Sequence, residues 1–491
     1  MGTHFLTRLV KCILPSGVLA AFLLLIACTK EPDSGTGPVG AVTNSEVNQW
    51  VADSMRYWYY WNNAIPGDEQ LNFDQDPAVF FERLLNRPTD RFSWIQNIRE
   101  LKGELSGIIK TSGLGYGFFG INKGNGLIAG LAVRYVLKGS PADMAGIKRG
   151  DLFVELDGQE MPVDADGYVQ GIDALQGSDP FTLTKAVLDG DGNIVNTGET
   201  VGLTPVEGFR ESAILLDTVL TAENGTKVGY LFYNRFLATQ AQELVDAFVK
   251  FKQAGVQELI VDERYNSGGA LAIAGLLSAL IHRDFDISSP FIRMDFNSGL
   301  KDAEYTYGDL FGAENNDLVQ SLNLGLGRVF ILATSSSASA SELLINNLRP
   351  FLGNANVIHI GGTTVGKDEA SYTIENTDPR FADSWGIQPI VLKYQNKNGE
   401  GGFTDGLTPQ YAVAEESVAL QPIGSKADPL LGTALGIIDP GMRARLDMQM
   451  SIRRARSGSR FKELPGGGQD MSDAQPLDVT ELLKGKKPVL R

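Results

Sequence analysis

Residues 329–348 read VFILAT, SSSASASE and LLINNL in succession, and this stretch decides the fold and the chemistry that we expect of the chain. The apolar run at 329–334 predicts a buried strand, and residues 343–348 predict a helix. The serine-rich run at 335–342 therefore lies at a strand-to-helix turn. A serine hydroxyl becomes an effective nucleophile only when a neighbouring base takes its proton. The alternative interpretation is a flexible serine–alanine loop before an ordinary helix.

Strands and helices alternate on both sides of this stretch. Residues 228–233, 259–262 and 357–360 predict strands, while 238–252 and 271–281 predict helices. This alternation indicates an α/β core with parallel strand pairing, which we place at residues 225–425. The net charge of −16 argues against a nucleic-acid partner, because nucleic-acid binding needs a basic surface.

A lysine downstream of the serine run is the candidate base. Burial can lower the pKa of a lysine until its neutral form is available, and Ser-Lys is a known nucleophile–base pair. Lys367 ends the sequence TTVGK, 28 residues after Ser339. A histidine base is not indicated, because one histidine falls in a leader segment and neither of the others sits in a recognisable catalytic motif. The three histidines are His4, His282 and His359.

The serine run resembles the active-site motif of the C-terminal processing peptidases, also called the tail-specific protease family. That motif reads Ser-Ala-Ser-Ala-Ser-Glu, and its middle serine is the nucleophile. The resemblance implies that Ser339 is the nucleophile and that Lys367, in a Gly-Lys pair, is the base. Residues 263–269, ERYNSGG, resemble the family's Asn-Pro-Gly-Gly turn with serine in place of proline. The family's oxyanion hole then implies backbone N–H donors at Gly268 and Ala340.

One position departs from the family pattern. Many members carry a glutamine four residues after the lysine, and this chain has Ser371 there. Ser371 is therefore the candidate residue for orienting the lysine. Glu369 is an unfavourable neighbour, because a nearby carboxylate stabilises the charged lysine and raises its pKa.

Residues 105–210 resemble a PDZ domain of envelope proteases. The resemblance rests on short β-like runs separated by GSPA (139–142), AGI (145–147), GDL (150–152) and DG (157–158). A PDZ domain receives an extended peptide as an added strand and binds its terminal carboxylate through backbone N–H groups. The resemblance implies a carboxylate loop at 113–118, before a strand. Its peptide-binding residues would be Gly115, Tyr116, Gly117 and Phe118.

The first residues predict a bacterial lipoprotein leader. A basic flank precedes an apolar run at 18–27 that is too short for a permanent membrane helix. LIAC at 25–28 resembles a lipobox, which implies lipidation of Cys28 and removal of residues 1–27. The alternative is a plain signal peptide with an incidental cysteine. We expect a lipid-anchored protein of the bacterial cell envelope, at the periplasmic face or the cell surface.

These segments predict a multidomain α/β protein. A flexible tether at 28–44 precedes a helical N-terminal domain at 45–104, and a C-terminal helix and mobile tail occupy 426–491. The resemblance implies a ClpP/crotonase-like serine protease core that needs no metal or cofactor. It also implies a Ser-Lys endopeptidase acting on proteins or peptides with free C-termini. The alternative function is a non-catalytic, PDZ-containing lipoprotein that only binds peptides.

Overall fold

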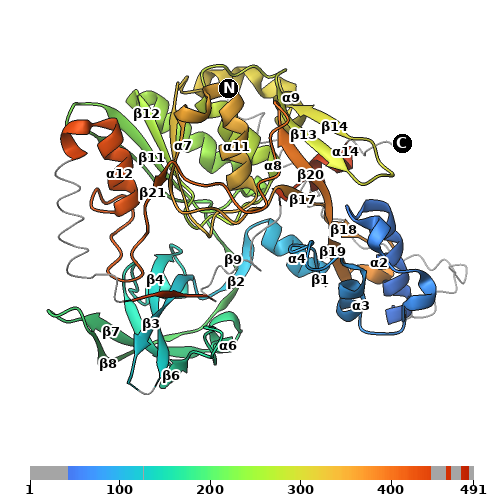
Figure 1. Cartoon of the computed structure of the whole chain (residues 1–491), viewed down its shortest axis with the longest axis horizontal. Coiled ribbons are helices and arrows are strands. Elements are labelled where there is room, and N and C mark those ends of the chain that lie inside the picture. Colours follow the sequence, from blue (N-terminus) through green and yellow to red (C-terminus); the bar gives the residue numbers. More distant parts are fainter. Residues whose placement is uncertain (1–41, 125, 444–460, 466–476, 486–491) are drawn as a thin grey trace, which may run out of the picture.

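The computed structural model describes residues 42–443 except 125, together with 461–465 and 477–485. Cys28, most of the predicted tether and most of the basic run after residue 440 lie outside these residues. Three parts are visible in Figure 1: a central α/β core, a β-rich part below it and a helical N-terminal part beside both. Within the described residues, no helix combines the length and apolar character needed to cross a membrane.

The core is built on a six-stranded sheet in the described residues. Strands β11 to β21 run parallel and β10 pairs antiparallel with β11, so the predicted α/β class is confirmed. The sheet starts before residue 225, where the core was predicted to begin. Its strands, in spatial order, are β10 (Ile214–Thr221), β11 (Lys227–Tyr233), β12 (Glu258–Asp262), β15 (Val329–Ala333), β16 (Val357–Gly361) and β21 (Tyr411–Ala412).

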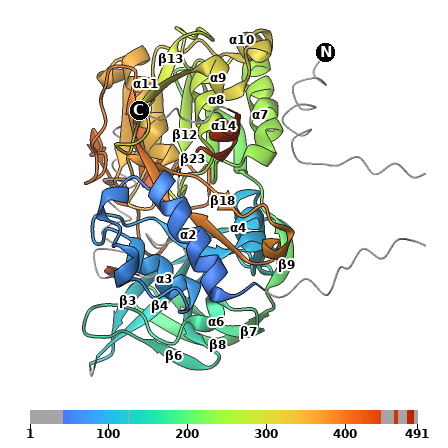
Figure 2. The same ribbon diagram turned by 90° about the vertical axis from the view of Figure 1, so that its right-hand side faces the viewer.

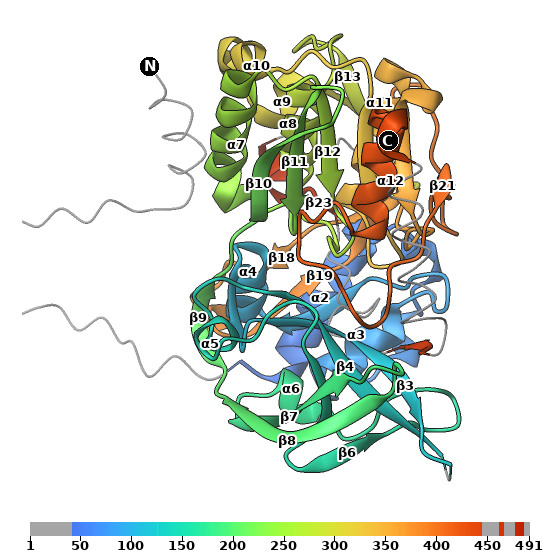
Figure 3. The same cartoon turned by 90° about the vertical axis from the view of Figure 1, so that its left-hand side faces the viewer.

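Helices cover both faces of this sheet. One face packs against α7 (Ala241–Ala254), α8 (Leu271–Ile281) and α11 (Ala340–Leu352). The other face packs against α12 (Pro429–Ile438). Figure 3 shows α7 and α12 on opposite sides of the strands. Because both faces are buried, β15 is a continuous apolar run, and β12 and β16 are apolar except at Glu258, Asp262 and His359.

A second, five-stranded sheet lies beside α11 and carries the segment that follows Lys367. The antiparallel strands β13 and β20 form its centre, and β17 pairs with β20. Parallel pairing with β17 adds the two-residue β23 from near the C-terminus. In spatial order the strands are β14 (Ala303–Thr306), β13 (Pro290–Phe296), β20 (Ile390–Asn396), β17 (Glu369–Ser371) and β23 (Leu477–Asp478).

The β-rich part contains a twisted antiparallel sheet with its own apolar core. Its strands include β3 (Leu114–Asn122), β4 (Leu127–Val136), β5 (Leu152–Leu156), β6 (Gln159–Pro162), β7 (Phe181–Leu188) and β8 (Ile194–Leu203). One prediction is wrong here: Gly115, Tyr116, Gly117 and Phe118 are residues of β3 and not of a loop before it. The alternation of small and large residues from 114 explains the difference, because each glycine accommodates a side chain of the adjacent β4. A Cβ on Gly117 would lie 2.6 Å from the Arg134 guanidinium group.

The N-terminal part is mostly helical, as predicted. Helix α2 (Asn44–Trp58) starts at a capping box between Thr43 and Glu46, and α3 (Pro77–Leu84) follows an Asp76 cap. Helix α4 (Ile98–Leu105) follows β1 (Trp94–Asn97), which pairs with β19 (Trp385–Gln388). Figure 2 shows α2 near β18 (Ile374–Glu375), and the Trp58 ring lies 4.7 Å from that of Tyr372. This part therefore contacts the second sheet directly.

The C-terminal prediction is correct in one part and wrong in another. A helix lies at 429–438, within the predicted 426–491, while most of the basic run after residue 440 lies outside the described residues. The tail was predicted to be mobile, yet two described pieces of it have defined structure. Residues Glu463–Leu464 form β22, which pairs with β3, and β23 is followed by α14 (Thr480–Gly485). Leu477 is fully buried, which explains why this part of the tail is held against the core.

Candidate active site

Ser339 occupies a strained and buried position at the N-terminus of α11. Its backbone has φ 58° and ψ −108°, in a region that non-glycine residues rarely adopt. The side chain is fully buried, and among the described residues its Oγ has no hydrogen-bond partner. A buried hydroxyl without a partner costs free energy, so this position is better suited to chemistry than to stability.

The serines on either side are used structurally. Ser337 Oγ donates to the carbonyl oxygen of Glu263 at 2.7 Å and accepts from the N–H of Thr334 at 2.9 Å. Ser341 Oγ donates to the carbonyl oxygen of Asn266 at 3.0 Å. The two hydroxyls thus fix the serine turn against the residues that follow β12. Of the three alternating serines, Ser339 alone keeps its hydroxyl free in the described structure.

The carboxylate of Glu342 joins the serine turn to the lysine segment. Its Oε2 accepts the backbone N–H groups of Ser339 and Lys367, both at 2.8 Å. Its Oε1 accepts the N–H of Gly366 at 2.7 Å and the hydroxyl of Thr364. Burial raises the pKa of Glu342, and the four hydrogen bonds act in the opposite direction. The sequence motif contains Glu342, but this clamping role depends on contacts that the motif does not reveal.

Tyr394 of β20 makes a second connection between the same two segments. Its hydroxyl lies 3.2 Å from the carbonyl oxygen of Ser339 and 2.8 Å from that of Lys367. The phenol is fully buried. Glu342 therefore holds the N–H groups of Ser339 and Lys367, and Tyr394 holds their carbonyl groups. No pattern in the sequence around Tyr394 indicated this contact.

Lys367 is fully buried in an environment that favours its neutral form. Its Nζ lies 4.3 Å from the centre of the Phe92 ring, which belongs to the segment before β1. Phe92 packs with Ala338, which precedes Ser339, and with Val365, two residues before Lys367. Burial lowers the pKa of Lys367 to about 7, although the negative charge of Glu369 raises it. Desolvation thus outweighs the carboxylate that the sequence indicated as an unfavourable neighbour.

Burial also shifts the pKa of Glu369 itself. Desolvation raises the pKa of Glu369 to about 7, which reduces the charge that it presents to Lys367. The Nζ of Lys393 lies 3.9 Å from Glu369 Oε2 and 3.5 Å from Asp368 Oδ1. Lys393 is therefore a second cation, besides Lys367, that interacts with the carboxylates at the start of β17.

Ser371, the candidate lysine-orienting residue, is held by a glutamine from another strand. Its Oγ accepts a hydrogen bond from Gln388 Nε2 at 2.9 Å, and both side chains are fully buried. Gln388 ends β19, and its Oε1 has no partner among the described residues. The structure thus places a glutamine amide beside position 371. Gln388 is distant in sequence, so the motif could not reveal it.

The two predicted oxyanion donors differ in whether their N–H group already has an acceptor. Ala340 is the first residue of α11, so its N–H has no acceptor within the helix. The N–H of Gly268 already donates to Asn266 Oδ1 at 2.9 Å. The next residue, Gly269, has φ 135°, and a Cβ there would lie 2.4 Å from the Phe236 carbonyl oxygen. Gly269 is therefore required by a close backbone approach, and Gly268 by its backbone φ of 114°.

A buried ionic cluster fixes the position of this glycine turn. Arg264, two residues before Asn266, bonds Asp262 and Asp428 through paired contacts of 2.7–2.9 Å and also bonds Glu415 at 2.7 Å. Arg149 of the β-rich part reaches the same Glu415 oxygen at 2.6 Å. Such buried charges are tolerated because each one is paired. The cluster joins the β-rich part to the core next to the glycine turn, because Arg264 lies just before that turn in the chain.

The predicted site residues therefore form two groups. Ser339, Ala340 and Lys367 lie around Glu342 and Tyr394, with Gly268 on the turn that contacts the serine run. Ser371 follows Lys367 on β17 and contacts Gln388 instead. The C-terminal β23 also reaches this region, because the N–H of Asp478 donates to the Gly269 carbonyl oxygen at 3.0 Å. Gly115 to Phe118 lie in the β-rich part, and the side chains of Tyr116 and Phe118 are buried in its core.

Comparison with known proteins identifies the family. Residues 46–94 match the peptidase S41 N-terminal domain, and residues 227–413 match peptidase family S41. A carboxyl-terminal-processing protease of Picosynechococcus sp. (strain ATCC 27264 / PCC 7002 / PR-6) is 25% identical over 72% of this chain and 76% of its own length. The carboxy-terminal processing protease CtpA of Bacillus subtilis (strain 168) is 26% identical over 56% of this chain, and the match spans only 51% of CtpA.

A solved structure agrees with this assignment. A protein of Bacteroides fragilis NCTC 9343, assigned to the S41 proteases, superimposes with a TM-score of 0.64 at 25% identity. The superposition covers 80% of this chain and 97% of that protein. The resemblance read from the serine and glycine motifs is thereby confirmed, because residues 227–413, which contain both motifs, match peptidase family S41.

Proposed function

We propose that this chain is a serine endopeptidase in which Ser339 is the nucleophile and Lys367 is the general base. The observation that carries the proposal is the free, buried hydroxyl of Ser339. Glu342 and Tyr394 hold the backbone of Ser339 and also that of Lys367, a lysine whose pKa burial lowers to about 7. A general base is most effective when its pKa lies near the working pH. Lys367 meets that condition without a histidine.

The first half of the reaction forms an acyl-enzyme. Neutral Lys367 takes the hydroxyl proton, and Ser339 Oγ attacks the carbonyl carbon of the scissile peptide bond. The negative charge that develops on the carbonyl oxygen is stabilised by the N–H of Ala340 and the positive end of the α11 dipole. Gly268 contributes its N–H once that group is released from Asn266 Oδ1. Lys367 then delivers its proton to the departing amine, and the peptide bond breaks.

The second half regenerates the enzyme. Lys367, neutral again, takes a proton from water, and the resulting hydroxide equivalent attacks the acyl ester on Ser339. The ester bond breaks, the product leaves with a new carboxyl group, and Lys367 returns the proton to Ser339 Oγ. The Phe92 ring and its apolar neighbours keep Lys367 desolvated through both halves. Loss of that desolvation would return the lysine to its charged form.

We further propose that the β-rich part is a PDZ-like domain that receives the C-terminal tails of protein substrates. The supporting observations are its antiparallel sheet and the direct ionic connection to the core through Arg149 and Glu415. The leader sequence supports a lipid anchor at Cys28 and a location in the bacterial cell envelope. The names of the curated relatives, which are carboxyl-terminal-processing proteases, agree with tail recognition.

Three alanine variants test the assignment of the nucleophile. Ser339→Ala should abolish casein cleavage and keep the melting temperature at or above the wild-type value, because it removes a buried hydroxyl that has no partner. Ser337→Ala and Ser341→Ala should keep activity but lose about 1–3 kcal/mol each, because each leaves a buried partner unsatisfied. Cleavage by Ser339→Ala at the wild-type rate would refute the proposal. Peptide binding without any Ser339-dependent cleavage would establish the alternative, a non-catalytic peptide-binding protein.

A further inference from the structure

The edge of the β-rich sheet beside β3 is occupied by the chain's own C-terminal segment. Strand β22 pairs antiparallel with β3, with Glu463 opposite Phe119 and Leu464 opposite Phe118. The N–H of Gly120 also donates to the carbonyl oxygen of Lys462 at 2.9 Å. In the sheet order of the described residues, β3 would be the terminal strand without this addition. Residues 461–465 therefore lie where an added peptide strand would bind.

Side chains on both faces of β22 anchor it to the sheet. Leu464 is 6% exposed and joins the apolar core that contains Tyr116 and Phe118. On the opposite face, Glu463 forms an ion pair with Arg134 of β4. The Phe461 ring packs against Phe119, with 5.5 Å between ring centres. The segment thus resembles a bound peptide, with main-chain pairing, one buried leucine and one paired carboxylate.

The direction of β22 also fits a peptide ligand. Because the pairing is antiparallel, the chain from Glu463 to Leu464 runs toward the start of β3 and the Gly113 turn that precedes it. Its described pairing covers 118–120 and ends before Pro465, which has no N–H to continue the ladder. The C-terminal residues of a bound tail would approach the Gly113 turn from the same side.

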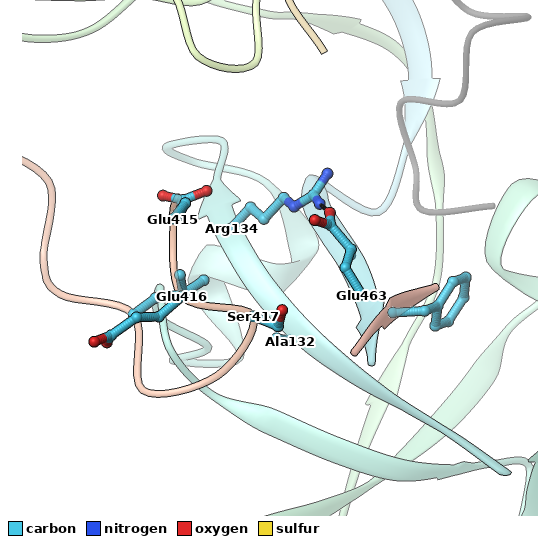
Figure 4. Close-up of a pocket in the computed structure, with 9 residues that line it drawn as sticks. Ala132, Arg134, Glu415, Glu416, Ser417 and Glu463 are labelled. Carbon is cyan, nitrogen blue, oxygen red and sulfur yellow. Dashed lines mark hydrogen bonds and ion pairs between the residues drawn. The ribbon is translucent and has the colours of Figure 1, made fainter. Parts of the chain in front are cut away.

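A small cavity of about 20 Å³ adjoins this segment. Figure 4 shows Arg134 reaching from β4 toward Glu463, with Glu415, Glu416 and Ser417 on the loop opposite. Arg134 is the cation among the residues that line the pocket. The cavity has room for about one water molecule. Arg134 there is already paired with the Glu463 carboxylate, so a carboxylate that replaces Glu463 would find the same partner.

We propose that residues 461–465 are an internal ligand of the β3 edge, which the tail of a substrate must displace before it can bind. The proposal rests on the proposed function, in which this sheet receives substrate tails. It also defines the kind of peptide that competes best: an extended segment with an apolar residue at the Leu464 position and a carboxylate that reaches Arg134. The carboxylate can come from an acidic side chain or from the end of a chain.

Peptide binding to matched variants of the full chain tests the proposal. The probe is a fluorescent peptide, GSRFKEL, which repeats residues 458–464 and ends in a free carboxylate. The double variant Glu463→Lys, Leu464→Asp places a charge in the leucine site and repels Arg134, so the segment leaves the edge. Truncation is unsuitable, because it also removes β23, whose Leu477 is fully buried in the main core. Val195→Asp is the matched control, because Val195 is 43% exposed on β8 at the opposite edge of the sheet.

The double variant should bind the probe at least tenfold more tightly than the wild type. Burial of one leucine side chain corresponds to about ten- to hundredfold in an equilibrium constant. An internal competitor lowers the apparent affinity in proportion to the fraction of chains whose edge it leaves free. Glu463→Lys alone changes an exposed side chain that cannot unfold the sheet, and it should give an intermediate gain. Val195→Asp should bind as the wild type does. Equal affinity in wild type and double variant would overturn the proposal.

Two further arms complete the experiment. If an amidated GSRFKEL binds as tightly as the acid, the glutamate side chain of the peptide is the carboxylate that reaches Arg134. If the amide binds more weakly, the terminal carboxylate of the peptide reaches Arg134. Absence of binding to every variant would overturn the internal-ligand proposal. Casein cleavage by the same preparations, with Ser339→Ala as the blank, reports separately on the proposed protease function. If the protein cleaves casein but binds no peptide, the proposed protease function stands and the internal-ligand proposal is refuted.

Discussion

Replacing Glu342 by glutamine tests whether one carboxylate holds the active site together. The carboxylate accepts four hydrogen bonds, two at each oxygen, from the N–H groups of Ser339, Gly366 and Lys367 and the hydroxyl of Thr364. Glutamine keeps one oxygen and replaces the other with an NH₂ group. In either orientation, the NH₂ group faces two donors that have then lost their acceptor.

The structure gives the size of the expected effect. Two unsatisfied buried donors at about 1–3 kcal/mol each predict that Glu342→Gln loses about 2–6 kcal/mol of stability. The change also releases the backbone of Ser339 or of Lys367 from the common anchor. Misplacement of a catalytic group by about 1 Å can cost on the order of 100-fold in rate, so kcat should fall by a similar factor. KM should change far less, because the substrate does not contact Glu342 in the proposed mechanism.

Thermal melting and casein kinetics, measured below the melting temperature of the variant, provide the assay. Glu100→Gln is the matched control, because Glu100 is exposed on α4 and should leave both quantities unchanged. Wild-type stability and wild-type kcat in Glu342→Gln would refute the clamp. A large loss of stability with an unchanged kcat in the folded protein would show that the carboxylate serves the fold and does not position Ser339 or Lys367.

Two other predictions concern the neighbours of the lysine. Because neutral Lys367 acts as the base and burial lowers its pKa to about 7, kcat should rise with pH through about 7 and level off above it. Glu369→Gln removes a charge that raises this pKa, so the midpoint of the pH profile should move down, on the order of one unit, and an unmoved midpoint would exclude electrostatic coupling. Tyr394→Phe removes the hydroxyl contacts to two carbonyl groups, so it should lower stability by about 1–3 kcal/mol in urea melts and lower kcat more than KM. If stability, kcat and KM of Tyr394→Phe all equal those of the wild type, the Tyr394 hydroxyl does not help to hold the Ser339 and Lys367 segments together.

The sequence predicted the parts of the fold that repeat simple patterns. The helix predicted at 271–281 and the buried strands near 228, 259, 329 and 357 are present with bounds that differ by at most a few residues. Their apolar runs are long and uninterrupted, so local pattern and tertiary burial agree. The assignment to the family also followed from short motifs, because the serine run, the double glycine and the Gly-Lys pair occur in the family's order.

The parts that sequence did not predict depend on long-range contacts. Tyr394, Gln388 and Phe92 reach the site from distant segments, and none of them lies in a motif. The loop predicted at Gly115 is a strand, because its glycines accommodate side chains of β4 that only strand pairing brings close. The tail after residue 460 is polar and rich in glycine, so its composition predicted mobility. Buried apolar residues, Leu464 in one piece and Leu477, Val479 and Leu483 in the other, attach the two described pieces to two different sheets.

The origin of the Phe92 ring has a consequence for biosynthesis. The ring that covers Lys367 belongs to the N-terminal part, and the Arg91 guanidinium beside it donates to the Gly366 carbonyl oxygen at 2.6 Å. Strand β23, near residue 478, pairs with the strand that follows the lysine. The environment that neutralises the lysine therefore requires segments nearly four hundred residues apart in the printed sequence. A chain that is still emerging or only partly folded has the hydroxyl and the amine but leaves the amine charged in water. Under the proposed mechanism, such a chain cannot cleave its neighbours, and completion of folding is what activates the protease.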